Sequence, residues 1–284
     1  MTTERSIVEV ITSYLEDDSV SVPVFNAVAV RLQQVLARPD YRMETVHQLI
    51  SADPGLASHV LRVANSSFYS GLSSAATVQD AIVRLGANEV ANIAMLATQR
   101  EMYRCTDERF KGMMQSLWLH SYCCAVGSRW LAQRAGLPDL VPEAFLAGLL
   151  HDVGKLFLLK VAEQIIEREK LGKALTPAIM EEVLGSLHVE RGYLLMEKWH
   201  MPQIYCDVVR YHEAESWPQG NILLAVVRLA NLACRRLGIG LTHDPGVLLF
   251  TSSEAHVLGI KEIALAELEI LLEDTMKRPM LGPA

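Results

Sequence analysis

The residues of this sequence that are best able to do chemistry are histidines accompanied by a carboxylate in the second half of the chain. His151 and Asp152 are adjacent and follow the apolar run AFLAGLL directly. Three more histidines come from other segments, and the full candidate set is His120, His151, Asp152, His188 and His212. Imidazole and carboxylate ligands together suit Zn, Fe, Ni or Mn rather than Ca. These residues therefore form a candidate set of ligands for a divalent transition-metal ion.

Local geometry restricts how the adjacent His151 and Asp152 can share one site. Neighbouring residues on a regular helix point about 100° apart, so both can face one ion only at a helix end or a distortion. Gly154, two residues later, makes such a distortion accessible. The other interpretation is that these side chains are hydrogen-bonded core residues, although a charge buried in an apolar stretch requires a partner or a metal. The residues alone leave both interpretations open.

The elements that must position these side chains are helices. Apolar residues recur at intervals of three and four, and strand-like alternation is scarce. Start and stop signals such as Asp53-Pro54 and Gly86 divide the pattern into segments. The expected helices cover about residues 24–37, 43–52, 54–65, 77–86, 88–99, 112–136, 143–161, 177–187, 190–199, 202–212, 222–237 and 260–276. The fold class is predicted to be all-α, a multi-helix bundle.

Two helical lobes that share an interface are expected, because no Gly/Ser-rich linker separates the halves of the chain. We expect an N-terminal helical lobe over residues 1–108, packed on a second helical lobe over residues 109–284 that carries the histidines. The apolar last helix is expected to close the core, with dimerisation as the alternative.

Composition excludes several functional classes. Lys and Arg number 26 against 33 Asp and Glu, so the net charge of −7 argues against a broad nucleic-acid or anionic-membrane footprint. The five cysteines contain no CxxC motif, which is typical of a reduced, cytoplasmic protein. The first 18 residues carry three glutamates and do not resemble a signal peptide. GxGxxG, P-loop and GxSxG motifs do not occur.

The segment HDVGK and the motifs around it resemble the HDOD family, the HD-related output domain of bacterial signalling proteins. This family lies within the HD superfamily of metal-dependent phosphohydrolases. The resemblance covers roughly residues 20 to 235, in the order that the family shows. The matching motifs are Val22-Pro23, SADPGLASHVLRVANS, AIVRLG, WLHS, GLLHDVGK, His188 with Gly192, Trp199 with Pro202, and Tyr211-His212.

The resemblance implies a metal-ligand set with two departures. The family's first His corresponds to His120 and its His-Asp pair to His151-Asp152, but Asn231 stands where active HD enzymes have a further Asp. The related HD-GYP phosphodiesterases add a His, here His188, and a His-His pair, here Tyr211-His212. A neutral amide in place of a carboxylate is expected to weaken the hold on a divalent ion.

The resemblance therefore implies a regulatory output protein of bacterial signal transduction with a degenerate HD-type metal site. Such a protein is expected to act through a signalling protein partner or a small phosphate-containing ligand, without nucleic acid or membrane. The alternative is a metal-dependent phosphohydrolase acting on a nucleotide or cyclic dinucleotide. In that case Lys155 would contact phosphate, and Glu213 or Glu190 would replace the missing carboxylate. Lys155 also has a simpler interpretation as a solvated helix residue.

Overall fold

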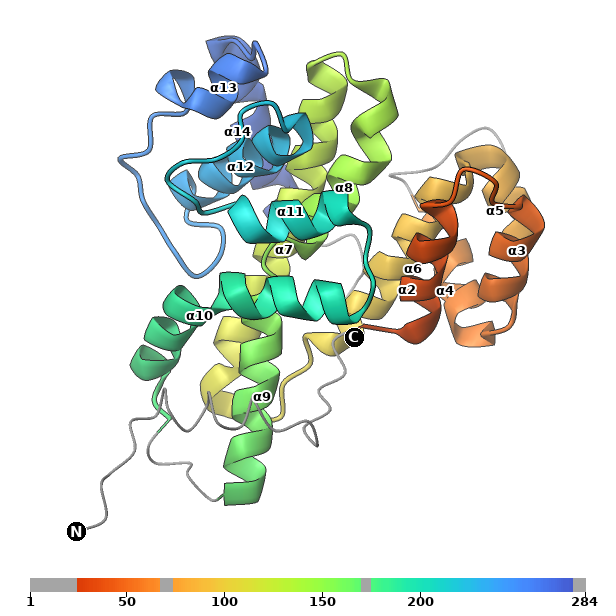
Figure 1. Cartoon of the computed structure of the whole chain (residues 1–284), viewed down its shortest axis with the longest axis horizontal. Coiled ribbons are helices and arrows are strands. Elements are labelled where there is room, and N and C mark those ends of the chain that lie inside the picture. Colours follow the sequence, from red (N-terminus) through yellow and green to blue (C-terminus); the bar gives the residue numbers. More distant parts are fainter. Residues whose placement is uncertain (1–24, 67–73, 170–174, 278–284) are drawn as a thin grey trace.

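The computed structural model describes residues 25–66, 74–169 and 175–277, and within these ranges it contains helices and no strand (Figure 1). The all-α prediction is confirmed. In Figure 1 the first helices form a smaller group at one side, and the helices from α7 onward form a larger group. The expected motif Val22-Pro23 and the segment 1–18 lie outside the described residues.

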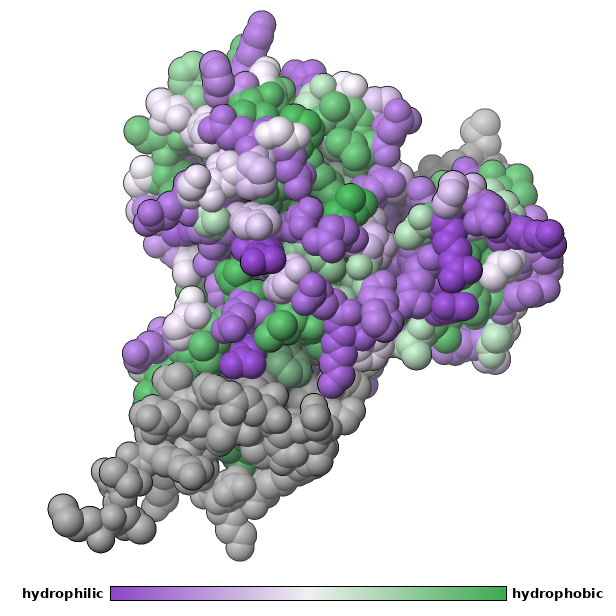
Figure 2. All heavy atoms as spheres, viewed as in Figure 1, coloured by the Kyte–Doolittle hydropathy of each residue, from purple (hydrophilic) through white to green (hydrophobic). Residues whose placement is uncertain are grey.

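The smaller group consists of α2 (Ala27–Leu36), α3 (Met43–Ser51), α4 (Pro54–Ala64), α5 (Val78–Leu85) and α6 (Ala87–Met102). Buried side chains from all five helices form one hydrophobic core. Figure 2 shows hydrophilic residues on the outward side of this group. The core therefore lies between the helices, as amphipathic helices require.

Capping residues explain where these helices begin. Asp53 caps α4 by accepting a hydrogen bond from Leu56 N at 3.0 Å, and Thr77 and Asp80 form a reciprocal capping box at the start of α5. α2 begins at Ala27 because Asn26 caps it. The predicted start of this helix near residue 24 was therefore too early.

The helix α6 belongs to two hydrophobic cores. Val90 and Ile93 are buried with the smaller group, whereas Met95 and Leu96 are buried in the core of the larger group. Asn92 of α6 also donates to the carbonyl of Pro142 at 2.7 Å. This helix thus contributes to the packing of both groups.

The larger group is arranged around α7 (Glu108–Arg134), which packs most extensively against three other helices. These are α8 (Val141–Leu150), α12 (Ile222–Arg236) and α14 (Glu262–Lys277). α9 (Val153–Glu169) and α10 (Pro177–Lys198) pack against each other. The remaining elements are the 3₁₀ turns η1 (Pro138–Leu140) and η2 (Leu249–Thr251) and the helices α11 (Gln203–Tyr211) and α13 (Ser253–Val257).

The helix boundaries differ from the sequence-based prediction at two places in the chain. The expected helices 177–187 and 190–199 are one continuous helix, α10, because packing on α9 and α11 supports it through its glycines. The expected helix 143–161 is interrupted at His151-Asp152, which separate α8 from α9. His151 and Asp152 therefore lie at a helix end, where two adjacent side chains can face the same site.

The last helix closes the core, as expected. Leu265, Leu268 and Leu272 of α14 are buried, and Leu268 and Leu272 pack close to Gly127 of α7. Ile263 and Ile270, on the other side of α14, are exposed. Among the described helices, none has the length and apolar character that a bilayer span needs.

Candidate metal centre

Five side chains from four parts of the larger group converge in its interior. His120 comes from the middle of α7, and His188 comes from the middle of α10. His151 and Asp152 lie between α8 and α9, and His212 follows α11 directly. Each is at most 5% exposed. We call these five residues, His120, His151, Asp152, His188 and His212, the HD cluster.

The carboxylate of Asp152 lies at the centre of the HD cluster. Its Oδ2 is 3.4 Å from His120 Nε2 and 3.6 Å from His151 Nε2. Its Oδ1 is 3.2 Å from His212 Nε2 and 3.7 Å from His188 Nε2. Each oxygen of Asp152 therefore faces one pair of imidazoles, an arrangement in which one carboxylate can bridge two neighbouring ligand groups.

Backbone carbonyls orient all four imidazoles in the same way. The Nδ1 of His120 lies 2.9 Å from the carbonyl oxygen of Ile239, and each of the other histidines places Nδ1 on a carbonyl of its own helix. Those contacts are His151 to Gly148 at 2.8 Å, His188 to Leu184 at 2.6 Å and His212 to Val209 at 2.9 Å. Because a carbonyl only accepts, each Nδ1 carries the hydrogen, which leaves Nε2 as the ligand atom.

These tautomers are assigned from the hydrogen-bond network. They leave unprotonated Nε2 atoms close to one another at the centre of the cluster. The Nε2 atoms of His120 and His151 are 3.2 Å apart, and those of His188 and His212 are 3.4 Å apart. Two lone pairs at these separations repel unless a proton or a cation lies between them. The arrangement therefore favours a bound positive charge.

Charges around the cluster reinforce this conclusion. Burial would raise the pKa of Asp152, but Lys155 and the histidines hold it well below its usual value. Burial lowers the pKa of His151 well below its usual value and that of His188 to about 4, so both rings are neutral. For His120, burial is outweighed by hydrogen bonding to Asp152 and Cys234, which raises its pKa to about 10. The lowered pKa of Asp152 and the raised pKa of His120 both favour positive charge beside the Asp152 carboxylate.

The donor set fits a divalent transition-metal ion. Asp152 Oδ1 is buried, and it accepts no hydrogen bond from the residues that the structure describes. Four imidazole nitrogens and this carboxylate supply the N/O ligands that Zn, Fe, Ni or Mn prefers. Two groups that include Asp152 have ligand atoms close enough to hold an ion, namely His120, His151 and Asp152, and Asp152, His188, His212 and Glu213.

Lys155 and Glu213 lie at the border of the cluster. Lys155 Nζ is 2.9 Å from Asp152 Oδ2 and 3.6 Å from Glu213 Oε1. Its side chain is 12% exposed, so the interpretation of Lys155 as a solvated helix residue is wrong. Glu213 is exposed and its Oε2 is 3.5 Å from His188 Nε2. Glu190, the other candidate carboxylate, is an exposed residue of α10 outside these ligand groups.

Gly154 acts through close packing and not through an unusual backbone conformation. Its φ is not positive, but a Cβ at this position would overlap the carbonyl oxygen of His188 and lie 2.8 Å from Gly192 N. The predicted role of Gly154 is corrected accordingly. Its missing side chain lets α9 approach α10, which brings Asp152 and His188 together.

The two positions that depart from the family pattern lie on α12 and at the end of α11. Asn231 is buried on α12, and Tyr211 is the last residue of α11. Arg228 of α12 donates to the carbonyls of Tyr211 and His212, both at 2.9 Å. The same guanidinium donates to the buried carboxylate of Glu254 at 2.6 Å. Arg228 therefore holds the backbone of Tyr211 and His212 in place.

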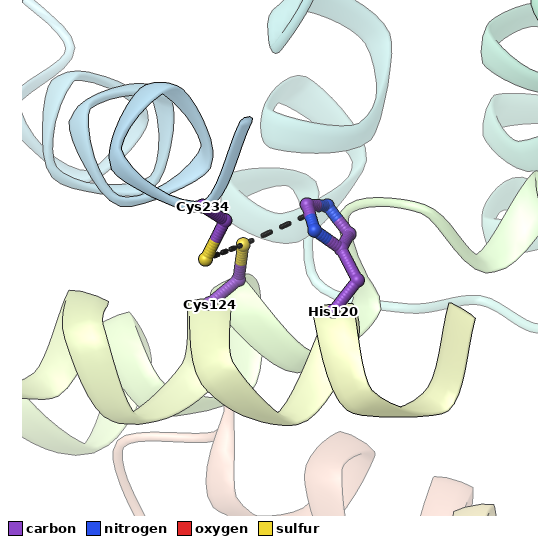
Figure 3. A group of neighbouring side chains, drawn as sticks. All are labelled: His120, Cys124 and Cys234. Carbon is purple, nitrogen blue, oxygen red and sulfur yellow. Dashed lines mark hydrogen bonds between the residues drawn. The ribbon is translucent and has the colours of Figure 1, made fainter. Parts of the chain in front are cut away.

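Two buried thiols were missed as ligands by sequence reasoning. Cys124 Sγ lies 3.7 Å from His120 Nε2 and 3.6 Å from Cys234 Sγ (Figure 3). A hydrogen bond from the Cys124 thiol, together with His120, lowers the pKa of Cys234 to about 6 despite its burial. The spacing of four residues between His120 and Cys124 was a local signal for this contact, whereas Cys234 is 110 residues away from Cys124.

The sequence matches a model of a known protein family. The family model of the HDOD domain matches residues 22–215. An uncharacterized protein of Treponema pallidum (strain Nichols) is 22% identical over 227 residues, which are 76% of this chain and 42% of that protein. The chain thus spans less than half the length of this relative.

Solved structures share the fold over nearly the whole chain. An HDOD domain protein of unknown function from Geobacter sulfurreducens has a TM-score of 0.74 and 22% identity, covering 96% of this chain and 98% of that one. A protein of Shewanella amazonensis SB2B, provisionally named a metal-dependent phosphohydrolase, has a TM-score of 0.68 and 19% identity, covering 95% and 97%. A Marinobacter aquaeolei VT8 protein, provisionally named a signal transduction protein, has a TM-score of 0.69 and 22% identity, covering 94% and 62%.

Proposed function

Because the chain belongs to the HDOD family, we propose that it is a regulatory module of bacterial signal transduction. In this proposal the HD cluster binds one divalent transition-metal ion, and the output is contact with a protein partner or a small phosphate-containing ligand. The family assignment supplies the signalling class. The cluster itself supplies the reason for a metal.

The observation that carries the proposal is the burial of the HD cluster. His151, Asp152 and His188 are at most 1% exposed. A phosphodiester substrate must place its phosphorus beside the ion, and a metal-bound water must reach that phosphorus. Ligands buried this deeply instead resemble a site that stabilises one arrangement of its helices. Bound metal would then couple α7, the α8–α9 junction, α10 and α11.

The chemistry of Asn231 supports the same interpretation. A carboxylate from α12 would neutralise part of the charge of a divalent ion, but an amide cannot. Phosphoryl transfer by two ions depends on such charge neutralisation and on bridging carboxylates. A single ion needs only three or four N/O ligands, and the cluster offers five.

A metal-dependent phosphohydrolase is the second candidate, and it is favoured by Glu213. This exposed carboxylate borders the Asp152, His188 and His212 ligand group and lies 3.6 Å from Lys155 Nζ. In that function a bound metal would lower the pKa of a water and stabilise the phosphoryl oxygens. Lys155 would orient the phosphate.

Metal analysis combined with an activity assay separates these functions. The wild type, His151→Ala and a control, His256→Ala at an exposed histidine of α13, are purified without chelator or polyhistidine tag. Each is measured by elemental analysis and assayed with bis(p-nitrophenyl) phosphate and a cyclic dinucleotide. The expected result is about one more equivalent of metal in the wild type and control than in His151→Ala, without turnover. Turnover that His151→Ala abolishes would establish the second candidate, and absence of metal in all three proteins would contradict both.

A further inference from the structure

Cys124, Cys234 and His120 form a compact group on one side of the HD cluster. Figure 3 shows His120 and Cys124 on successive turns of α7, with Cys234 reaching toward them from α12. Both thiols are completely buried. The three ligand atoms lie within 4.8 Å of one another.

The two separations that involve Cys124 Sγ match the edges of a tetrahedral metal site. With Zn–S bonds of about 2.3 Å and Zn–N bonds of about 2.0 Å, two sulfurs lie about 3.8 Å apart, and a sulfur and a nitrogen about 3.5 Å apart. The observed distances are 3.6 Å for Cys124 Sγ to Cys234 Sγ and 3.7 Å for Cys124 Sγ to His120 Nε2. Little movement is needed for an ion to contact all three atoms.

The imidazole of His120 is held in the orientation that a ligand needs. Its Nδ1 is engaged by the carbonyl of Ile239 at 2.9 Å, so Nε2 is the atom presented to the thiols. Gly240, in the loop after α12, packs against the ring, and a Cβ there would lie 3.0 Å from it. The loop therefore fixes both the tautomer and the position of the ring.

Charge and ligand softness select the kind of ion. Asn231 and Cys234 are buried three residues apart on α12, so this helix offers a thiolate one turn after the position where it lacks a carboxylate. Two thiolates neutralise a divalent cation, which suits a fully buried site. Thiolate ligands favour Zn²⁺ and other thiophilic ions over Mg²⁺ or Mn²⁺.

We propose that His120, Cys124 and Cys234 form a thiolate–imidazole site for a thiophilic ion, of which Zn²⁺ is the natural probe, linking α7 to α12. On binding, each thiol releases its proton to solvent and forms a bond to zinc through sulfur, without any redox step. Because His120 Nε2 bonds to one ion at a time, this ion takes His120 away from the HD cluster. The site goes beyond the proposed function, since it does not depend on a signalling role.

Cobalt substitution of the full-length protein tests the proposal. The reduced, metal-free protein is titrated with Co²⁺, because a thiolate–cobalt bond gives a near-ultraviolet charge-transfer band that N/O ligands do not. We expect this band in the wild type and its displacement by Zn²⁺. Cys124→Ser and Cys234→Ser are each expected to lower the band and the Zn²⁺ affinity at least about tenfold.

Cys123→Ser is the matched control. Cys123 is equally buried on α7 but is outside the ligand group, so this variant is expected to retain the band. His151→Ala is also expected to retain it, which separates this site from the proposed HD-cluster ion. A wild type without the band, or a band that survives in both Cys124→Ser and Cys234→Ser, overturns the proposal.

A measurement on the wild type alone guards against variants that fail to fold. X-ray absorption at the zinc edge of the zinc-loaded protein distinguishes sulfur at about 2.3 Å from nitrogen or oxygen at about 2.0 Å. Two sulfur ligands are the expected result. A first shell of nitrogen and oxygen alone would overturn the proposal, whatever the variants show.

Discussion

Gly154 lies directly against the backbone of His188, with no space between them for a side-chain carbon. A Cβ at Gly154 would overlap the carbonyl oxygen of His188 and approach Gly192 N to 2.8 Å. Because Asp152 is two residues before Gly154, the same close approach places its carboxylate beside the His188 imidazole. The contact between α9 and α10 thus determines part of the candidate metal site.

Gly154→Ala is expected to destabilise the protein by at least about 2 kcal/mol, because overpacking against backbone atoms cannot be relieved by a rotamer change. Urea unfolding followed by circular dichroism measures the effect. Gly185→Ala is the control on α10, since no atom within 4 Å would meet its Cβ. That control is expected to be neutral or stabilising by up to about 1 kcal/mol. Equal stabilities of the two variants would contradict the packing argument.

Asn231→Asp is expected to raise the affinity of the protein for Mn²⁺, on the order of tenfold, because it returns an anionic ligand to α12. The metal-free variant is expected to be less stable than the wild type, because an unpaired charge would be buried. Isothermal titration with Mn²⁺ and thermal unfolding measure the two effects. Asn221→Asp makes the same change at the N-cap of α12, where aspartate caps equally well. If both variants bind Mn²⁺ alike, position 231 does not face the ion.

Arg228→Ala is expected to cost about 3–5 kcal/mol, because it leaves the buried Glu254 carboxylate without its cation. It also frees the carbonyls of Tyr211 and His212, so metal retention by the HD cluster should fall. Denaturant unfolding and elemental analysis test both statements. Arg236 lies on α12 like Arg228 and forms a partly exposed ion pair with Glu269 of α14. Arg236→Ala is therefore expected to cost less than about 1 kcal/mol. If Arg228→Ala loses no more stability than Arg236→Ala, Arg228 does not stabilise the protein by pairing with the buried Glu254.

Gly240→Ala is expected to displace the His120 ring and to lower metal binding. Gly240 has φ of +125°, and its Cβ would lie 3.0 Å from that ring. The strain should also lower stability by about 1–3 kcal/mol. Gly259→Ala has positive φ but no atom within 4 Å of its Cβ, so it should lose stability without loss of metal. The metal content of the purified proteins separates the two effects.

Much of the fold was readable from the chain because helices are made by local interactions. Apolar residues spaced three and four positions apart predicted the all-α class. Asp53 and Thr77 cap their helices by accepting hydrogen bonds from residues three positions later. These contacts are the same in any tertiary setting. The prediction was wrong where packing competes with local signals, as in α10, which continues through the expected break near residue 188.

The candidate ligands were named from the sequence, but their arrangement was decided by tertiary structure. The five members of the HD cluster come from four parts of the fold, and only the packing of α7, α10 and α11 around the α8–α9 junction brings four imidazoles to one carboxylate. The Ile239 carbonyl that orients His120 is 119 residues away from it, and Cys234 is 110 residues away from Cys124. Residue types and spacing carry the chemistry of a ligand. Contacts between distant segments decide which ligand atoms meet at one site, and these contacts form only when the helices pack.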